Sequence, residues 1–133
     1  MNWVFGEGIT ETYLESAEVF GFIYRIDFEN DCWYIGKKQT HSYRKIPSRK
    51  LDGSKSLYKK TISKTSDWKT YNSSSIHVLE LISKGVPYTK EIIEVVEVGG
   101  SLEYLEARYL FKNDALEDPM CLNKNIMGRF FKK

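Results

Sequence analysis

Two tyrosines ten residues apart, each inside a short apolar run, are the side chains of this chain best suited to chemistry. Tyr24 and Tyr34 carry phenolic hydroxyls, which can orient a water molecule, or act as a base if nearby cations lower their pKa from about 10. Lys37 and Lys38 follow directly after Gly36, so such cations are close in sequence. A hairpin whose tyrosines merely cover the edge of a core would show the same spacing, because aromatic residues are common in strands.

Positive charge is concentrated in one segment, although the whole chain carries a formal net charge of only +2. Residues 37–69 hold eleven Lys and Arg against two acidic residues, and the rest of the chain is net acidic. Aromatic and hydroxyl side chains interleave these cations, a mixture suited to contacts with phosphates. Composition alone fits a solvated lysine-rich loop equally well, but beside the tyrosines a nucleic-acid partner is favoured.

The tyrosines need a hairpin to bring them together. Apolar residues within 20–28 share one parity, as alternation along a strand requires, and residues 33–35 fit a second short strand. The turn-prone residues 29–31 stand between them. Residues 37–68 are polar and turn-rich, and a short helix is expected over residues 57–62.

Downstream, the pattern predicts a helix, a strand and a second helix. Serines at 73–75 are expected to cap a helix that runs to Lys84, and the β-branched residues 91–98 indicate a third strand. Ser101 is the expected N-cap of a helix through about Leu116. The expected buried faces comprise Ile76, Val78, Leu79 and Ile82 in the first helix, and Leu102, Leu105, Tyr109 and Leu110 in the second.

These elements predict an α+β fold, with a small mixed β-sheet made of the N-terminal hairpin and a third strand, flanked by helices. We expect an acidic N-terminal extension over residues 1–18 and a single domain over residues 19–133, with a basic insertion at residues 37–70. Two cysteines without metal-ligand spacing argue against a disulfide framework. The sequence shows no signal peptide or long apolar stretch, so a cytoplasmic protein with no membrane partner is expected.

Two glutamates, Glu103 and Glu106, stand one helical turn apart on the last predicted helix. Residues at i and i+3 can share a helix face, here separate from the apolar stripe. Such a pair is most often only solvated, and the two residues alone indicate no further role.

The order and spacing of these parts resemble the GIY-YIG nuclease superfamily, over roughly residues 19–127. Its two tripeptides stand here as F-I-Y at residues 22–24, with Gly21 just before, and as Y-I-G at residues 34–36. Many members follow the second tripeptide with a lysine, matched by Lys37. The family also has an arginine about eight residues beyond the glycine, and Arg44 stands at that position.

Further parts of the resemblance concern the metal and the end of the domain. A glutamate on the helix after the third strand binds the divalent metal in this family, which makes Glu106 the expected ligand of Mg²⁺ or Mn²⁺, with Glu103 as the alternative. An asparagine after that helix is matched by Asn123. The segment of residues 66–74 is similar to the W-x-x-Y-x-G-S-S run of some phage-type members, with Ser73 in place of the glycine.

The chain departs from the family pattern in three places. Its first tripeptide begins with Phe rather than Gly, which should be harmless because the tyrosine is the chemical part. Some members have His or Tyr four residues past the arginine, where this chain has Ser48; His41 or Tyr43 could take over that role, or it is absent. We also expect none of these 133 residues to form the DNA-binding domain that homing-type members append.

The resemblance implies a metal-dependent endonuclease of the small phage or homing type that hydrolyses phosphodiester bonds in DNA, in the cytoplasm of a bacterial host if phage-encoded. Tyr24 is the expected base, Tyr34 orients the water, and the guanidinium of Arg44 binds phosphate oxygens. A non-catalytic nucleic-acid-binding module, or an inhibitor or interaction protein, are the alternatives. Double-stranded DNA is the expected partner, and a homo-oligomer is left open. The residues expected to contact DNA are Lys37, Lys38, His41, Lys45, Lys55, Lys59, Lys60, Trp68, Lys69, Ser73, Ser74 and Asn123.

Overall fold

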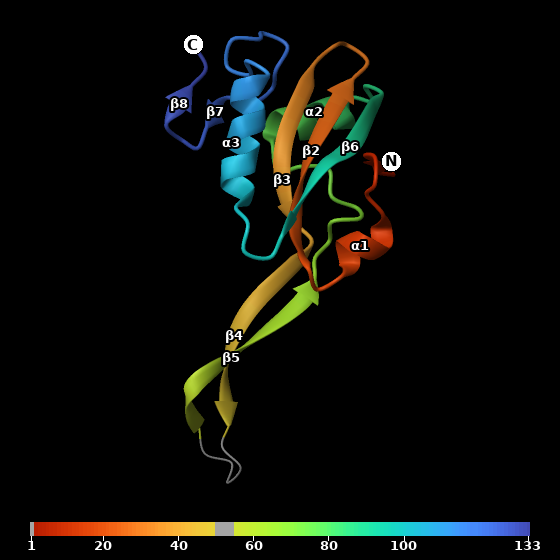
Figure 1. Ribbon diagram of the computed structural model, residues 1–133. Coiled ribbons are helices and arrows are strands. Elements are labelled where there is room, and N and C mark those ends of the chain that lie inside the picture. The colour runs from red at the N-terminus through yellow and green to blue at the C-terminus, as the bar shows by residue number, and fades with distance from the viewer. Residues whose placement is uncertain (1, 50–54) are drawn as a thin grey trace.

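A mixed β-sheet of four strands forms the centre of the computed structural model, which describes residues 2–49 and 55–133. Side chains are described for residues 2–43 and 63–133. The strands are Val4–Phe5 (β1), Val19–Phe28 (β2), Trp33–Gln39 (β3) and Tyr88–Glu97 (β6) (Figure 1). They lie in the order β1–β6–β2–β3, with β2 antiparallel to both neighbours and β1 parallel to β6, so β3 forms one edge.

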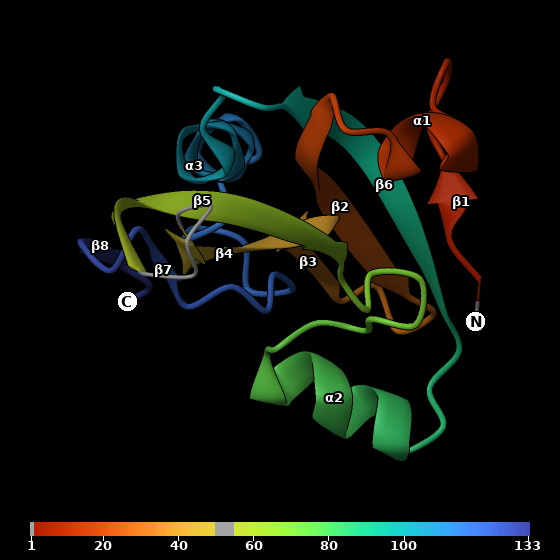
Figure 2. The ribbon, with the colours of Figure 1, turned by 90° about the horizontal axis from the view of Figure 1, so that it is seen from below.

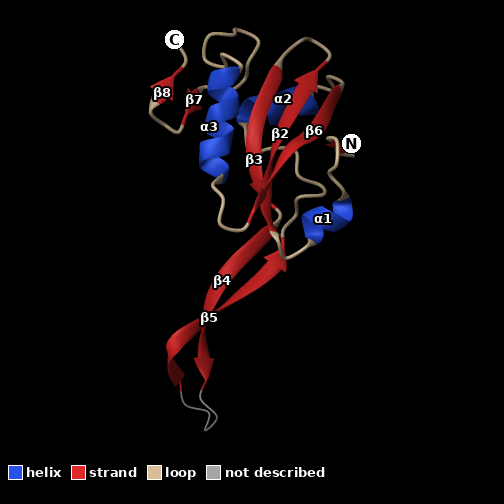
Figure 3. Ribbon diagram, viewed as in Figure 1, coloured by secondary structure: helices blue, strands red, loops and turns tan. Residues whose placement is uncertain are grey.

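Three helices flank the sheet: α1 (Glu11–Glu15), α2 (Ile76–Ser83) and α3 (Leu102–Lys112) (Figure 3). Helices α2 and α3 lie on opposite faces of the sheet (Figure 2). Each face therefore has its own hydrophobic core, with Phe22 in the cluster on the α2 side and Ile23 in the cluster beneath α3. The predicted α+β fold, a small mixed sheet flanked by helices, is confirmed. No helix in the described part of the chain is long and apolar enough to cross a membrane.

The predicted N-terminal hairpin is also confirmed, because β2 pairs with β3 and the chain turns between them. The register sets Tyr24 opposite Gly36 and Ile26 opposite Tyr34. Asp31, in the turn, has a left-handed φ of 71°. Since Tyr24 and Tyr34 lie on one face, diagonally across the two strands, alternation and register together bring their rings near each other.

The expectation of a turn-rich loop with a helix over residues 57–62 is wrong. His41–Arg49 (β4) and Lys55–Thr65 (β5) instead form a long antiparallel ribbon that projects from the rest of the domain (Figure 1). Lysine-rich residues have no strong strand preference, but β5 also contains β-branched residues, and pairing along β4 decides its conformation.

The two helices predicted downstream of the ribbon both form, but some of their buried residues and one of their ends differ from the prediction. Ser75 caps α2 by accepting a hydrogen bond from the Val78 amide, at 3.4 Å, and Val78 is buried as expected. Ile76 and Leu79 were expected in the core but are 73% and 43% exposed, because α2 packs through a stripe of Val78, Leu81 and Ile82 instead. The predicted third strand also forms, as β6.

Helix α3 begins at the predicted N-cap, since the Ser101 hydroxyl accepts from the Tyr104 amide at 3.1 Å. It ends at Lys112 rather than near Leu116, because the chain turns at Asp114, which has a left-handed φ of 51°. The Ala115 amide then donates to the Leu110 carbonyl, which closes the helix end.

The two ends of the chain pack onto the sheet. The Trp3 ring lies edge-on to the rings of Phe22 and Tyr24, and its indole nitrogen donates to the Trp68 carbonyl at 2.7 Å. At the other end, Ile126 is buried within the short hairpin of Asn125–Ile126 (β7) and Phe130–Phe131 (β8). The C-terminal segment therefore packs against the core through Cys121 and Ile126.

Candidate active site

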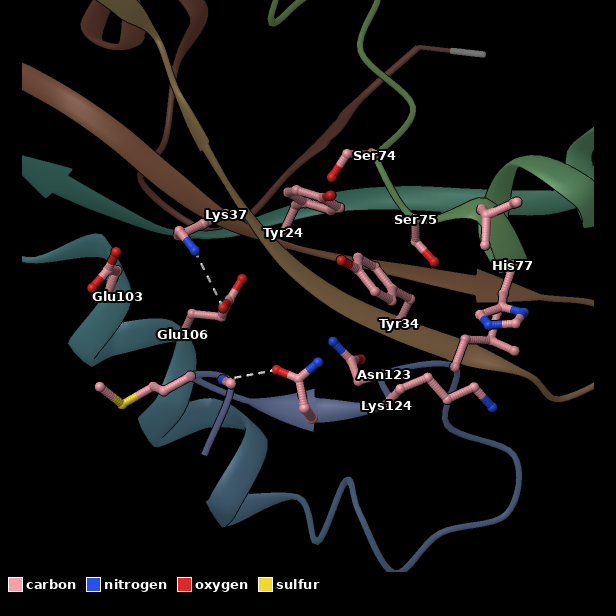
Figure 4. A pocket seen from close by; sticks show the side chains of 15 residues that line it. Tyr24, Tyr34, Lys37, Ser74, Ser75, His77, Glu103, Glu106, Asn123 and Lys124 are labelled. Atoms are coloured by element: carbon pink, nitrogen blue, oxygen red, sulfur yellow. Dashed lines mark hydrogen bonds and ion pairs between the residues drawn. The ribbon is translucent and has the colours of Figure 1, made fainter. Parts of the chain in front are cut away.

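A pocket of about 700 Å³ opens at the β3 edge of the sheet, between α2 and α3 (Figure 4). Side chains from β2, β3, α3, the start of α2 and the segment before β7 line it. The pocket thus collects residues that are up to about a hundred positions apart in the sequence. Seven of the residues selected from the sequence lie in its wall: Tyr24, Tyr34, Lys37, Ser74, Glu103, Glu106 and Asn123.

The tyrosine pair occupies the centre of the pocket. The rings of Tyr24 and Tyr34 have centroids 6.1 Å apart, and Tyr24 is only 1% exposed. The Tyr24 ring lies directly over Gly36, so a Cβ added there would sit 2.5 Å from the Tyr24 Cζ atom. Glycine in the second tripeptide is therefore explained by the close approach of the first tyrosine, not by an unusual backbone angle.

Both phenols are neutral at neutral pH in the chain alone. Burial raises the pKa of Tyr24 well above its ordinary value, and the neighbouring Tyr34 raises it further. Burial also raises the pKa of Tyr34, to about 12, with the negative charge of Glu106 as the next cause. Hydrogen bonding to Ser73 lowers the pKa of both groups. As neutral hydroxyls, the pair can orient a water molecule through hydrogen bonds.

Glu106 projects from α3 toward the tyrosines, as Figure 4 shows. Its Oε1 atom lies 3.6 Å from the Nζ atom of Lys37, and its side chain is 19% exposed. Burial raises the pKa of the Glu106 carboxyl, and the Lys37 ammonium lowers it. Glu103, one turn earlier, lines the same pocket but is exposed. Lys37 and Glu106 together place a cation and a carboxylate beside the tyrosine hydroxyls.

Asn123 fastens the C-terminal segment to the edge strand. Its Oδ1 atom accepts from the Ile35 amide at 3.0 Å, and its Nδ2 atom donates to the Ile35 carbonyl at 2.8 Å. The Leu122 amide also donates to the Trp33 carbonyl, at 2.8 Å. The Asn123 side chain therefore satisfies the outer-edge backbone of β3 at Ile35, between Tyr34 and Gly36, and fixes the C-terminal segment against this strand.

A buried lysine, Lys90, forms hydrogen bonds to the loop before α2. Lys90, 1% exposed, donates from Nζ to the Tyr71 carbonyl at 2.8 Å and to Asn72 Oδ1 at 3.1 Å. The same ammonium lies 4.3 Å from the ring centroid of Trp3, a cation–π arrangement. Ser73 follows in this loop with a left-handed φ of 97°, and its hydroxyl accepts from the Ser75 amide at 3.0 Å.

The chain matches the family model described as "Putative endonuclease segE, GIY-YIG domain" over residues 3–126. The chain belongs to the GIY-YIG endonuclease superfamily. No curated protein and no solved structure matches it. The match begins at Trp3 and ends at Ile126, so it includes β1, the ribbon and β7. Membership supports a nuclease that acts on DNA as the general function of this domain.

GIY-YIG nucleases generally depend on a divalent metal, and the pocket's donors fit one. The described residues contain no group of three or more His, Cys, Asp or Glu side chains that could enclose an ion. Mg²⁺ needs no such group, because it commonly keeps several waters and binds one or two carboxylates together with substrate phosphate oxygens. Glu106, with Glu103 one turn away, offers this kind of open, all-oxygen site.

Arg44, which the spacing from Gly36 matches to the family's arginine, stands on strand β4 of the ribbon. Arg44 pairs with Ile62 in the β4–β5 register, which fixes the position of its backbone. Its side chain lies outside the part of the chain whose side chains are described. The same holds for four of the lysines expected to contact DNA: Lys45, Lys55, Lys59 and Lys60.

Five other residues expected to contact DNA do not line the pocket, and one of them is Ser73, which is buried in the loop before α2. His41 is 7% exposed with Nδ1 3.0 Å from the Thr40 hydroxyl, and Trp68 is 1% exposed within the core. Lys38 pairs with Asp67 at 2.8 Å, and Lys69 pairs with two carboxylates of α1 at 2.7 and 2.9 Å. The Trp68 ring therefore packs inside the hydrophobic core against the sheet.

Sequence reasoning missed His77, Lys124 and Asn125, which also line the GIY-YIG pocket. Lys124 directly follows Asn123, the residue selected from the family resemblance, so this position was the available signal. His77 follows the capping serines at the start of α2. Lys90 was missed as well, because lysine is almost never fully buried and nothing in the local sequence indicated that its ammonium would be.

Proposed function

We propose that this GIY-YIG domain hydrolyses phosphodiester bonds in double-stranded DNA with the help of Mg²⁺ or Mn²⁺. One observation supports the proposal best: Tyr24, Tyr34, Lys37 and Glu106 converge on one pocket from β2, β3 and α3. A module that only binds DNA needs positive charge but has no use for a partly buried carboxylate beside two tyrosine hydroxyls. The convergence therefore favours catalysis over binding alone.

The reaction breaks the bond between phosphorus and the 3′ oxygen after attack by an in-line water. Tyr34 and Tyr24 orient that water. Once its own proton has passed to solvent, Tyr24 would accept the water's proton as a phenolate, and the departing 3′ oxygen takes up a proton from solvent. A metal held by Glu106 would polarise a phosphate oxygen and stabilise the departing 3′ oxygen. Lys37 places an ammonium at the same wall of the pocket, where it balances the charge of Glu106 and attracts the phosphate.

We assign to Arg44 the phosphate-binding role that the family motif predicts. A guanidinium is planar, permanently charged and able to donate two parallel hydrogen bonds to non-bridging phosphate oxygens. Lysine could supply only a point charge in that place. This assignment is supported by the spacing of eight residues from Gly36 and by the position of Arg44 near the base of the ribbon.

We assign DNA binding outside the pocket to the β4–β5 ribbon. It projects from the domain (Figure 1), and its sequence carries most of the basic residues of the segment 37–69. A two-stranded ribbon has dimensions that fit along a DNA groove, with cations available for the flanking phosphates. This places the binding surface on one side of the pocket and leaves the pocket for chemistry.

Incubation with supercoiled plasmid tests the proposal. With Mg²⁺, the wild-type chain should convert the plasmid to nicked or linear forms, and EDTA should stop the conversion. A chain that retards the plasmid in a gel at low salt, yet leaves it supercoiled with Mg²⁺ or Mn²⁺, would be a binding module instead.

A further inference from the structure

The pocket has two ends that differ in charge. Glu103 and Glu106, both on α3, are the only carboxylates among the described residues that line it. Beyond Tyr34, at the opposite end, the lining side chains include His77 from α2 and Lys124 from the segment before β7 (Figure 4). The proposed chemistry uses the end with the carboxylates and leaves this second end without a role.

The side chains of His77 and Lys124 are exposed and available to a ligand. At the other end of the pocket, Lys37 lies 3.6 Å from Glu106, which balances its charge. Lys124, in contrast, forms no ion pair with any side chain in the described part of the chain. An imidazole has at least one N–H donor in either protonation state, so His77 can donate a hydrogen bond to an anion.

The fold fixes the backbone that carries Lys124. Its carbonyl accepts from the Lys132 amide at 2.9 Å, and Asn123, just before it, is bonded to Ile35 on β3. Asn125, just after it, accepts from the Gly128 amide at 2.9 Å. The ammonium therefore extends from a rigid base, as a binding residue requires.

His77 is held as firmly. It stands in the first turn of α2, between the N-cap Ser75 and the buried Val78. Two segments that are 47 positions apart in the sequence thus bring a donor each to the same end of one pocket.

The size of the pocket indicates what this end receives. Its volume of about 700 Å³ falls in the range of pockets that enclose most of a small organic ligand, which is far more than one phosphate group needs. A DNA strand carries a phosphate on both sides of each nucleoside, so a nucleotide that has its scissile phosphate at Glu106 brings a second phosphate with it. Lysine and other N–H donors are common contacts of such phosphates.

We propose that the His77–Lys124 end of the pocket binds the phosphate next to the scissile one on the same DNA strand, so that the pocket holds one nucleotide by the phosphates on both its sides. The inference rests on the proposed nuclease function and adds a binding subsite to it. Because the contacts go to the backbone, the subsite serves every base alike.

Thymidine 3′,5′-bisphosphate is the probe, because it carries both phosphates but no phosphodiester and is therefore bound without being cut. Its affinity with Mg²⁺ is compared by NMR titration with the affinities of thymidine 5′-monophosphate and 3′-monophosphate. Wild type should bind the bisphosphate roughly tenfold more tightly than either monophosphate, as for one added set of hydrogen bonds between charged groups. The backbone amides of residues 75–77 and 123–125 should shift.

Lys124→Gln and His77→Gln should each remove most of this preference for the bisphosphate. Lys112→Gln is the matched control and should keep it, since Lys112 is also exposed but does not line the pocket. On duplex DNA, Lys124→Gln should reduce the slope of log affinity against log salt by about 0.9, the value for one phosphate contact. The single-turnover rate at saturating protein should stay near that of wild type.

Equal affinity of wild type for the bisphosphate and the monophosphates, or no binding of any of them, would overturn the inference. The same preference in both variants, or its loss in Lys112→Gln, would overturn it as well. A large fall in the saturating rate of Lys124→Gln would place that residue in the chemical step instead. If the preference behaves as expected but wild type does not cut DNA, the proposed hydrolysis falls and the subsite stands.

Discussion

Gly36→Ala should damage both stability and catalysis, although alanine normally stabilises a strand position relative to glycine by about 0.5–1 kcal/mol. Gly36 does not have a left-handed φ, so the backbone itself accepts alanine. The added Cβ would lie 2.5 Å from Cζ and 2.9 Å from Cε1 of Tyr24, inside any real carbon contact. The steric conflict with the Tyr24 ring therefore makes Gly36→Ala destabilising.

The Tyr24 ring cannot simply move away. It is 1% exposed, and the rings of Trp3, Phe22, Tyr34 and Tyr71 lie around it with centroids 5.5 to 6.3 Å distant. Overpacking of this kind costs about 1–3 kcal/mol. For a domain of this size, that loss corresponds to a fall of roughly 4–12 °C in the melting temperature.

Catalysis should fall further than stability indicates, because a shift of about 1 Å in a catalytic group can cost on the order of 10²-fold in rate. The assay is thermal unfolding together with single-turnover cleavage at a temperature where the variant is fully folded. A double-mutant cycle with Tyr24→Leu isolates the contact, since Gly36→Ala should cost little once the ring is gone. Wild-type stability and rate in Gly36→Ala, or strictly additive effects in the cycle, would refute this explanation of the glycine.

Three further predictions concern the phenols, the arginine and the ribbon. The pKa of Tyr34 is raised from 10.0 to about 12 in the folded chain. The raised pKa therefore contributes to the free energy of unfolding fully below pH 10 and progressively less as the pH rises toward 12. Urea unfolding should show that Tyr34→Phe loses less of its free energy of unfolding between pH 10 and 12 than wild type does; an equal loss would show that Tyr34 makes no such contribution. Arg44→Lys should lower the single-turnover rate by roughly 10²-fold with little change in binding, whereas Arg49→Lys should be nearly silent; equal, small effects would remove Arg44 from the active site. Neutralising Lys55, Lys59 and Lys60 should flatten the dependence of log affinity on log salt, which has a slope of about −0.9 per phosphate contact on duplex DNA; an unchanged slope would show that these lysines do not touch DNA.

Local sequence patterns predicted the helices and strands whose residue preferences match the positions they take in the folded domain. Strand alternation found the β2–β3 hairpin, and Ser101 marked the start of α3 because a hydroxyl there satisfies a free amide. The β4–β5 ribbon was missed because its lysines, serines and Pro47 carry no apolar alternation and its strand character comes from pairing. The two-residue strand β1 depends wholly on pairing with β6, which no local pattern could indicate.

The same division holds for the site. Tyr24, Tyr34, Lys37 and Glu106 could be predicted because a family resemblance fixes their order and spacing, and all four line one pocket. Sequence could not show that Asn123 satisfies the Ile35 backbone or that Lys90 holds the Tyr71 carbonyl. Those roles arise only when distant segments meet in the folded chain.

Mg²⁺-dependent, single-turnover cleavage of DNA by Glu106→Gln, with Glu103→Gln as the matched control, tests whether Glu106 holds a catalytic metal. Glutamine keeps the shape of the side chain but removes the charge that would hold the metal. We predict that Glu106→Gln folds and binds DNA like wild type but cleaves at least about 10³-fold more slowly, while Glu103→Gln retains most of its activity. Full activity in Glu106→Gln would show that Glu106 does not hold the metal, and an inactive Glu103→Gln beside it would move the metal ligand one turn toward the start of α3.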